Sequence, residues 1–176
     1  AGFEHLAVVE WDKWACDTIR DNQQRGFPLV ADWAVAEEDV RQFDLSALPE
    51  GLALIAGGPP CQPFSMGGKH RAYNDDRDMF PTAIDAIRKL KPRAFIIENV
   101  KGLTRPNFAN YYQYILLQLE FPEVARRASE TWEAHFHRLQ AEKTSGRPHA
   151  GGQLAYNVVP TLVNAADFGI PQKRER

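Results

Sequence analysis

Cys61 lies in a stretch of sequence that is unusually stiff for a thiol. The stretch reads GGPPCQPFS, with Pro59 and Pro60 before the cysteine and Pro63 after it. A thiol that acts as a nucleophile needs solvent access, a fixed direction and a route to the thiolate. The prolines supply the fixed direction, because each one restricts φ. The stretch therefore predicts a nucleophilic thiol at Cys61, although a lone cysteine is more often a small buried apolar residue.

The other cysteine, Cys16, fits that second description. It follows Trp14 in DKWACDTIRDN, where apolar residues recur at helical spacing. We therefore expect Cys16 and Trp14 on the apolar side of a helix, with Asp12 as its N-cap. Neither cysteine belongs to a CxxC pair or a His/Cys cluster, so no structural metal is expected.

A carboxylate and an amide, Glu98 and Asn99, end the apolar run AFII. A carboxylate in that position is costly to bury unless it is paired or protonated. Glu98 is therefore a candidate proton donor or hydrogen-bonding group, and Asn99 a candidate orienter of the loop. The alternative is a strand-end glutamate that simply reaches solvent.

Two arginines, Arg174 and Arg176, lie two positions apart in QKRER. In an extended chain both guanidinium groups point the same way, so they could clamp a phosphate or a carbonyl oxygen. The alternative is an exposed charged tail, which this pattern alone favours.

Three further residues could contact a nucleoside. Glu10 ends the first apolar run, where an acid typically accepts hydrogen bonds from ribose hydroxyls. The ring of Trp11 beside it could pack against adenine, and Asp39 could meet a base edge. Each of these patterns is weak alone.

Strands and helices must position these residues. Apolar runs predict strands at 5–11, 52–58, 93–100 and 156–165, and helical periodicity predicts helices at 12–22, 77–91 and, interrupted at Pro122, 108–143, before a loop at 144–152. This alternation indicates an α/β fold with a doubly wound, mostly parallel sheet. Ligands bind such sheets at the carboxyl ends of the strands, and Glu10, Cys61 and Glu98 all fall at such ends.

Composition limits the function only loosely. The 176 residues carry a net charge of −2, so no overall basic field indicates a nucleic-acid or membrane partner. A small basic cleft would not alter that sum. Two cysteines without a secretory segment or a long apolar run indicate a reducing compartment and no membrane span.

In this order, the motifs resemble those of the cytosine-5 DNA methyltransferase family. The resemblance runs through VVEWD, GGPPCQPFS, RDMF, IIENVKGL and NAADFGIPQKRER, and thus over most of the chain. It implies an S-adenosylmethionine-dependent methyltransferase with a Rossmann-like fold, in a bacterial restriction-modification system in the cytoplasm. Its substrate would be double-stranded DNA, with the target cytosine flipped out of the helix.

The resemblance also implies a role for each catalytic candidate. The thiolate of Cys61 would add to cytosine C6 and so activate C5 toward the methyl group. Glu98 would hydrogen-bond or protonate N3 as charge develops. Arg176 would hold the O2 atom, with Arg174 assisting near the base, and residues 62–76 would form a closing loop.

The same resemblance implies that S-adenosylmethionine is the cofactor. The residues that would line its pocket are Glu10, Trp11, Asp39, Val40, Pro60 and Phe80.

The sequence also departs from the family pattern. The family's opening glycine-rich element is absent, and the chain stops before a target-recognition region. We therefore expect residues 1–176 to be a partial catalytic domain, completed by missing segments or a second chain. Residues 104–153 are expected to be a helical insertion within it.

Three other functions are open at this stage. The same chemistry could act on cytosine in tRNA, or the chain could be a non-catalytic DNA-binding relative. The retained Cys61, Glu98, Arg174 and Arg176 argue against the latter. A thiol-dependent hydrolase would need a histidine base, and no histidine falls at a predicted strand end.

Overall fold

The computed structural model describes residues 2–60, 78–145 and 153–176. The chain divides into two compact units, Ala1–Pro49 and Glu50–Arg176. In the described residues each unit holds one pair of parallel strands together with helices. The expected α/β class is therefore confirmed, with parallel strand pairing.

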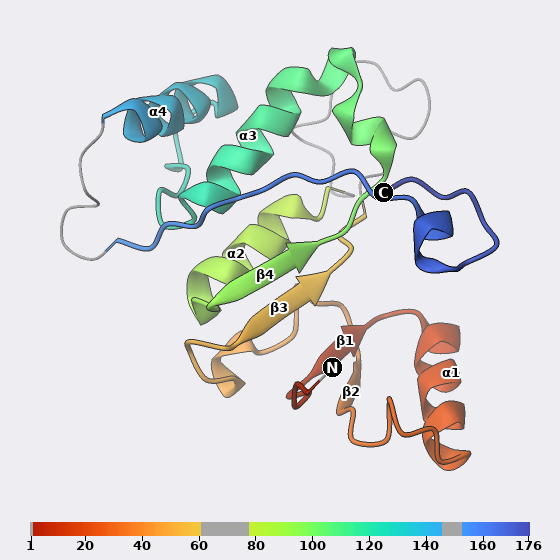
Figure 1. Cartoon of the computed structure of the whole chain (residues 1–176). Coiled ribbons are helices and arrows are strands. Elements are labelled where there is room, and N and C mark those ends of the chain that lie inside the picture. The colour runs from red at the N-terminus through yellow and green to blue at the C-terminus, as the bar shows by residue number, and fades with distance from the viewer. Residues whose placement is uncertain (1, 61–77, 146–152) are drawn as a thin grey trace. The chain divides into compact units, whose positions relative to one another are not determined.

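The first unit consists of β1 (Val8–Glu10), α1 (Lys13–Gln24) and β2 (Val35–Glu37), as Figure 1 shows. Helix α1 begins where predicted, because the Asp12 carboxylate accepts a hydrogen bond of 2.9 Å from the Ala15 N–H. The two strands pair in parallel with Glu10 opposite Glu37, so the helix is the crossover between them.

Two expectations for this unit have opposite outcomes. Cys16 is fully buried, as predicted. Trp14 is not on the buried side, since 77% of its surface is exposed and the Lys13 ammonium lies 5.6 Å from the ring centroid. Strand β2 was not predicted, because three residues are too short for an alternating pattern to be visible.

The second unit carries the longer elements. They are β3 (Leu54–Gly57), α2 (Phe80–Leu90), β4 (Ala94–Ile97), α3 (Ala109–Glu120) and α4 (Trp132–Thr144). Strands β3 and β4 are parallel, with Leu54 opposite Ala94 and Gly57 opposite Ile97. Helix α2 ends at Leu90, and the capping residue Lys91 adopts a left-handed conformation with φ of 43° before Pro92.

The core lies between α2, α3 and α4. Its buried residues are Phe80, Ile84, Ile87, Leu103, Tyr111, Tyr114, Ile115, Leu117, Leu119, Phe121 and Leu139. Phe95 and Ile97 of β4 pack against this cluster, whereas Ile96 between them is 60% exposed. One face of the β3–β4 pair is thus covered by helices, which Figure 1 shows beside the two strands.

The prediction of a strand at 156–165 is wrong. The described residues 153–163 form no strand, and only Asn164 enters an isolated antiparallel bridge, with Glu175. The residues are apolar enough for a strand, but Val159 and Leu162 are 71% and 56% exposed. A strand requires a hydrogen-bonded neighbour, and the described residues supply one only at the end of this segment.

The described helices are all too short and too polar to cross a membrane.

His135 on α4 joins three segments in the core of the second unit. It is 1% exposed, with Nε2 2.6 Å from the Val124 carbonyl oxygen and Nδ1 2.7 Å from the Tyr114 hydroxyl. The carbonyl can only accept, so Nε2 carries the proton and Nδ1 accepts from Tyr114. Burial lowers the pKa of His135 below its ordinary value of 6.5, because the charged imidazolium would lose its hydration.

This burial predicts that the protein loses stability as the pH falls below about 6.5. The unfolded imidazole takes up a proton there that the folded one resists. Glu130 does not contribute in this window, because pairing with Arg138 lowers its pKa to about 2. Urea unfolding between pH 5 and 8 measures the slope.

His135→Gln should remove that part of the pH dependence and lower the free energy of unfolding by about 1–3 kcal/mol. His137→Gln, an exposed change on the same helix, is the control. An equal pH slope in wild type and His135→Gln would contradict the assignment.

Candidate active site

The carboxyl ends of β3 and β4 bring two predicted site segments together. The pairing continues one step past the strands, because the Glu98 N–H donates to the Gly57 carbonyl oxygen at 2.9 Å. Pro59 and Pro60 therefore leave the sheet at the same edge as Glu98 and Asn99. This is the strand-end arrangement that the sequence predicted for these segments.

Asn99 ties the two strand ends to each other. Its Nδ2 donates to the Pro59 carbonyl oxygen at 2.9 Å, and its Oδ1 accepts from the Val100 N–H at 2.9 Å. Both ends of the side-chain amide are thus engaged, as expected of a residue that orients the loop. Cys61, the predicted nucleophile, and the predicted closing loop 62–76 lie outside the described residues.

Glu98 and Arg176 form an ion pair, with Arg176 Nε 2.6 Å from Glu98 Oε1. The Glu98 side chain is 51% exposed and that of Arg176 is 25% exposed. Of the two alternatives for Glu98, the structure shows elements of both: the carboxylate reaches solvent and is also paired. A half-exposed, paired carboxylate has one oxygen directed to an arginine and keeps acceptor capacity on the other.

Arg176 is positioned by backbone pairing. Arg176 and Val163 exchange two N–H to carbonyl hydrogen bonds of 2.9 Å each, and Ala165 donates to the Arg174 carbonyl oxygen at 2.9 Å. The segment is therefore extended as expected. The alternative of an exposed charged tail is wrong for Arg176, because Val163 binds its backbone and Glu98 pairs with its side chain.

Arg174 is placed differently from Arg176. Its backbone N–H donates to Asn164 Oδ1 at 3.1 Å, while its side chain is exposed and forms no ion pair with the described residues. The structure thus brings Arg176, but not the Arg174 side chain, into contact with Glu98.

Gly58 makes room for the Glu98 carboxylate. A Cβ atom built on Gly58 would lie 3.1 Å from Glu98 Oε2, closer than an ordinary contact. A Cβ on the neighbouring Gly57 would meet no described atom within 4 Å. Of the two glycines, only Gly58 is required by the position of Glu98.

In the first unit, two predicted cofactor residues follow one another at the end of β1. Glu10 is half-buried, and its Oε1 accepts from the Asp12 N–H at 2.8 Å, which leaves the second oxygen as an acceptor. The indole of Trp11 is 69% exposed. A free carboxylate oxygen beside an open aromatic ring suits a ribose and a base.

Asp39, the third of these residues, is engaged within the chain. Its side chain is 17% exposed and accepts from Arg41 Nε at 2.9 and 3.0 Å. The guanidinium group of Arg41 holds the pKa of Asp39 below its ordinary value. Val40 between them is half-buried. The sequence analysis did not predict Arg41 as the partner of Asp39. Two residues apart in a turn, the two side chains can reach each other.

The last two predicted cofactor residues belong to the second unit. Pro60 is exposed, and its carbonyl oxygen accepts from the Met79 N–H at 3.4 Å. Phe80 is 2% exposed and is part of the core. The structure thus joins the chain around Pro60 to the start of α2, with Phe80 directed inward.

Cys16 differs in kind from a reactive thiol. Its Sγ lies 3.3 Å from the Glu10 carbonyl oxygen, and burial raises the pKa of the thiol above its ordinary value. It stays protonated and packed, in agreement with its assignment from sequence.

Comparison with known proteins now gives the family. A family profile described as C-5 cytosine-specific DNA methylase matches residues 1–122, which is more than half of the chain. The chain belongs to this family.

Three relatives of this chain are named Type II methyltransferases. M.NgoMIV of Neisseria gonorrhoeae is 43% identical over 118 residues, which are 67% of this chain and 35% of the relative. M.NaeI of Lentzea aerocolonigenes is 33% identical over 177 residues, covering 100% of this chain and 34% of the relative. M.AquIA of Picosynechococcus is 29% identical over 184 residues, which cover 100% of this chain and 62% of the relative. The chain thus spans about a third of the first two relatives.

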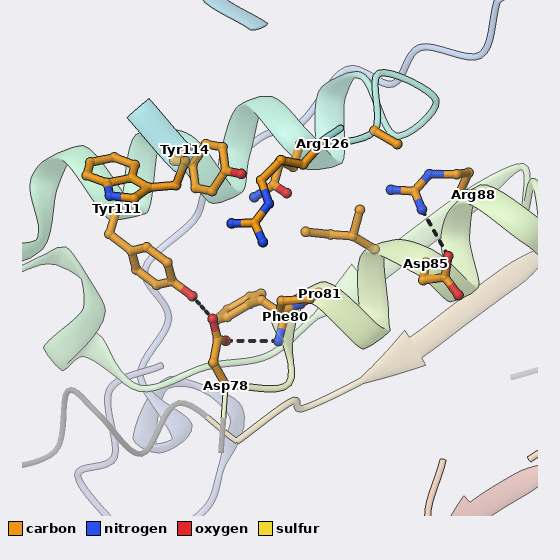
Figure 2. Close-up of a pocket in the computed structure, with 12 residues that line it drawn as sticks. Asp78, Phe80, Pro81, Asp85, Arg88, Tyr111, Tyr114 and Arg126 are labelled. Atoms are coloured by element: carbon orange, nitrogen blue, oxygen red, sulfur yellow. Dashed lines mark hydrogen bonds and ion pairs between the residues drawn. The ribbon is translucent and has the colours of Figure 1, made fainter. Parts of the chain in front are cut away.

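The structure also shows features of this chain that sequence reasoning missed. Lys101 Nζ lies 2.9 Å from Glu175 Oε2, which joins the segment after β4 to the QKRER segment a second time. Separately, a hollow of about 300 Å³ lies between α2 and α3. Figure 2 shows Asp78 there, bonded to the Tyr111 hydroxyl and, at 3.1 Å, to the Phe80 N–H. No pattern in the sequence pointed to either feature.

The close approach at Gly58 predicts that Gly58→Ala displaces the Glu98 carboxylate and weakens its pairing with Arg176. In an ¹⁵N NMR spectrum, the Arg176 Nε–H signal should move and exchange faster with water. Gly57→Ala is the matched control and should leave the signal in place. An unmoved signal in Gly58→Ala would show that the carboxylate is not held where described.

Proposed function

We propose that this chain is part of the catalytic domain of a DNA (cytosine-5)-methyltransferase that uses S-adenosylmethionine. We place it in a bacterial Type II restriction-modification system in the cytoplasm, with segments outside this chain or a second chain completing the domain. The contact between Glu98 and Arg176 is the observation that carries the proposal. It joins two residues, far apart in sequence, that the family pattern assigns to the same base.

Residues at one edge of the β3–β4 pair would perform the chemistry. Cys61 follows directly on Pro60, whose segment Asn99 holds through the Pro59 carbonyl. Its thiolate adds to C6 of the flipped-out cytosine and raises the electron density at C5. Glu98 would donate a hydrogen bond or a proton to N3, which has no N–H of its own, and so stabilise the charge that appears there. Once C5 has gained a methyl group, loss of the C5 proton lets the bond between Cys61 and C6 break and restores the ring.

The arginines would hold the base in register with Cys61. Arg176 already contacts the Glu98 carboxylate, so its remaining guanidinium N–H groups are suitably placed to donate to O2 of the same ring. Arg174, with its exposed side chain, assists from the neighbouring position.

The residues at the end of β1 fit the cofactor. S-adenosylmethionine, when bound, supplies an electrophilic methyl group. Glu10 has an oxygen left to accept from ribose hydroxyls, and the exposed Trp11 ring packs against adenine. Asp39 would have to share its carboxylate between Arg41 and the base edge, with the half-buried Val40 beside it as apolar surface.

A doubly wound sheet is the fold we propose for the complete domain. Both strand pairs are parallel, and the face of β4 that bears Ile96 is exposed here. A second helical layer on that face is what a parallel sheet normally requires. Within this fold we propose residues 104–153, which contain α3 and α4, as the helical insertion.

Replacing Glu98 tests its role on the base. In the protein expressed from its complete gene, Glu98→Gln should lower the methylation rate by about 10²–10³-fold, the cost of removing one preorganised group. Cofactor affinity, measured by calorimetry, should change little. Glu133→Gln, an exposed change on α4, is the control. Near-normal turnover of Glu98→Gln would make Glu98 merely a solvated strand end.

DNA carrying 5-fluorocytosine tests the nucleophile. Fluorine replaces the proton that must leave C5, so the enzyme should remain covalently attached after methyl transfer. Cys61→Ser should abolish the adduct, because a hydroxyl lacks the nucleophilicity of a thiolate. Cys16→Ser should retain it, since Cys16 is buried in the first unit.

Denaturing gels and peptide mass analysis detect and place the adduct. An adduct at Cys16 would refute the assignment, as would no adduct from an enzyme that methylates ordinary DNA. Matched 5-fluorocytosine RNA runs in parallel, and an adduct with RNA alone would move the substrate to RNA.

A further inference from the structure

A small basic hollow lies directly after Glu98. Its lining residues are Lys101, Gly102, Thr104 and Arg105, and its volume is about 400 Å³. All four belong to the 3₁₀ turn Lys101–Thr104 and the residue that ends it. The sequence analysis assigned no function to any of them.

The turn is held firmly to the core of the second unit. Leu103 at its centre is 4% exposed, and its N–H donates to the Val100 carbonyl oxygen at 3.1 Å. The Arg105 carbonyl oxygen in turn accepts from the Phe108 N–H at 2.9 Å, at the start of α3. The hollow therefore has a rigid backbone, which a preformed binding site needs.

The charge of the hollow is positive and is not fully neutralised by the described residues. Lys101 pairs with Glu175 at 2.9 Å. Arg105 is exposed, and its side chain forms no hydrogen bond or ion pair with the described residues. One guanidinium group is therefore available to an external anion, next to an ammonium group already held in place. The net charge of the whole chain is −2, so this positive charge is local.

The hollow adjoins the Glu98–Arg176 pair. Glu175 contacts Lys101, and the next residue, Arg176, contacts Glu98. Glu175 and Arg176 are consecutive residues of an extended segment, so their side chains leave it on opposite faces, and the two ion pairs hold the segment from both sides. Lys101 follows Glu98 by three residues, so their Cα atoms are at most about 11 Å apart, and a strand that presents a base to Glu98 has a phosphate within reach of the hollow.

We propose that the hollow binds a backbone phosphate of the substrate DNA beside the flipped cytosine. Arg105 makes the direct contact, and Lys101, positioned by Glu175, adds charge from the same turn. Guanidinium groups suit phosphate because they donate two parallel hydrogen bonds. A phosphate contact carries no base identity but fixes the register of the strand on the protein. The inference rests on the proposed function.

The salt dependence of DNA binding tests the contact. Each phosphate that a protein neutralises adds about 0.9 to the slope of log K against log salt. With a duplex containing the methylation site, Arg105→Gln should reduce the slope by about 0.9. Affinity at 0.1 M salt should fall by roughly eightfold, and by the same factor on unrelated sequences. Arg105→Lys should keep most of the slope.

The control is Arg127→Gln, which removes an exposed arginine from the segment between α3 and α4 and should leave the slope unchanged. An unchanged slope in Arg105→Gln would overturn the proposal. So would an affinity loss confined to one DNA sequence, or a slope change seen only with duplex RNA. Methyl transfer by the wild-type protein is measured separately, so that failure of the proposed function is distinguishable from failure of this contact.

Discussion

The parallel register between β3 and β4 is the constraint on which the candidate site depends. It places Gly57 opposite Ile97, and the hydrogen bond from Glu98 to Gly57 carries it past the end of the strands. A slip of one residue would turn Phe95 and Ile97 out of the core and Ile96 into it. The same slip would move Asn99 away from the Pro59 carbonyl. Burial of one face of β4 thus fixes the geometry at the strand ends.

Local signals in the sequence were enough to predict most helices and three of the strands. Asp12 marked the start of α1, and apolar spacing with the following Pro92 marked α2. The predicted strand at 156–165 failed for a nonlocal reason, because β propensity describes a side chain on a sheet and not the neighbour that completes it. Strand β2 was missed because its three residues carry little pattern of their own. Its pairing with β1 is what stabilises it as a strand.

In the site, too, local sequence patterns predicted single residues but not the contacts between residues that are far apart in the sequence. Motif spacing identified Glu98 and Arg176 separately, but their contact depends on the backbone pairing of Arg176 with Val163, which no spacing rule gives. The pairing of Lys101 with Glu175 could not be predicted either, because it also joins residues that are far apart in the sequence. Asp39 is the local exception, since its partner Arg41 lies two residues away in the same turn. What sequence alone omitted was which charges neutralise one another.

The contact between Gly58 and Glu98 has a consequence for how such sequences can diverge. Gly57 and Gly58 look interchangeable as letters, yet only Gly58 faces the carboxylate, at 3.1 Å from a hypothetical Cβ. A side chain at position 58 therefore requires the end of the Glu98 side chain to move away by a few tenths of an ångström. Across natural variants, a side chain at position 58 should therefore favour a shifted or shorter side chain at position 98, while position 57 drifts independently of position 98. The steric demand of one glutamate thus appears as an evolutionary coupling between residues forty positions apart.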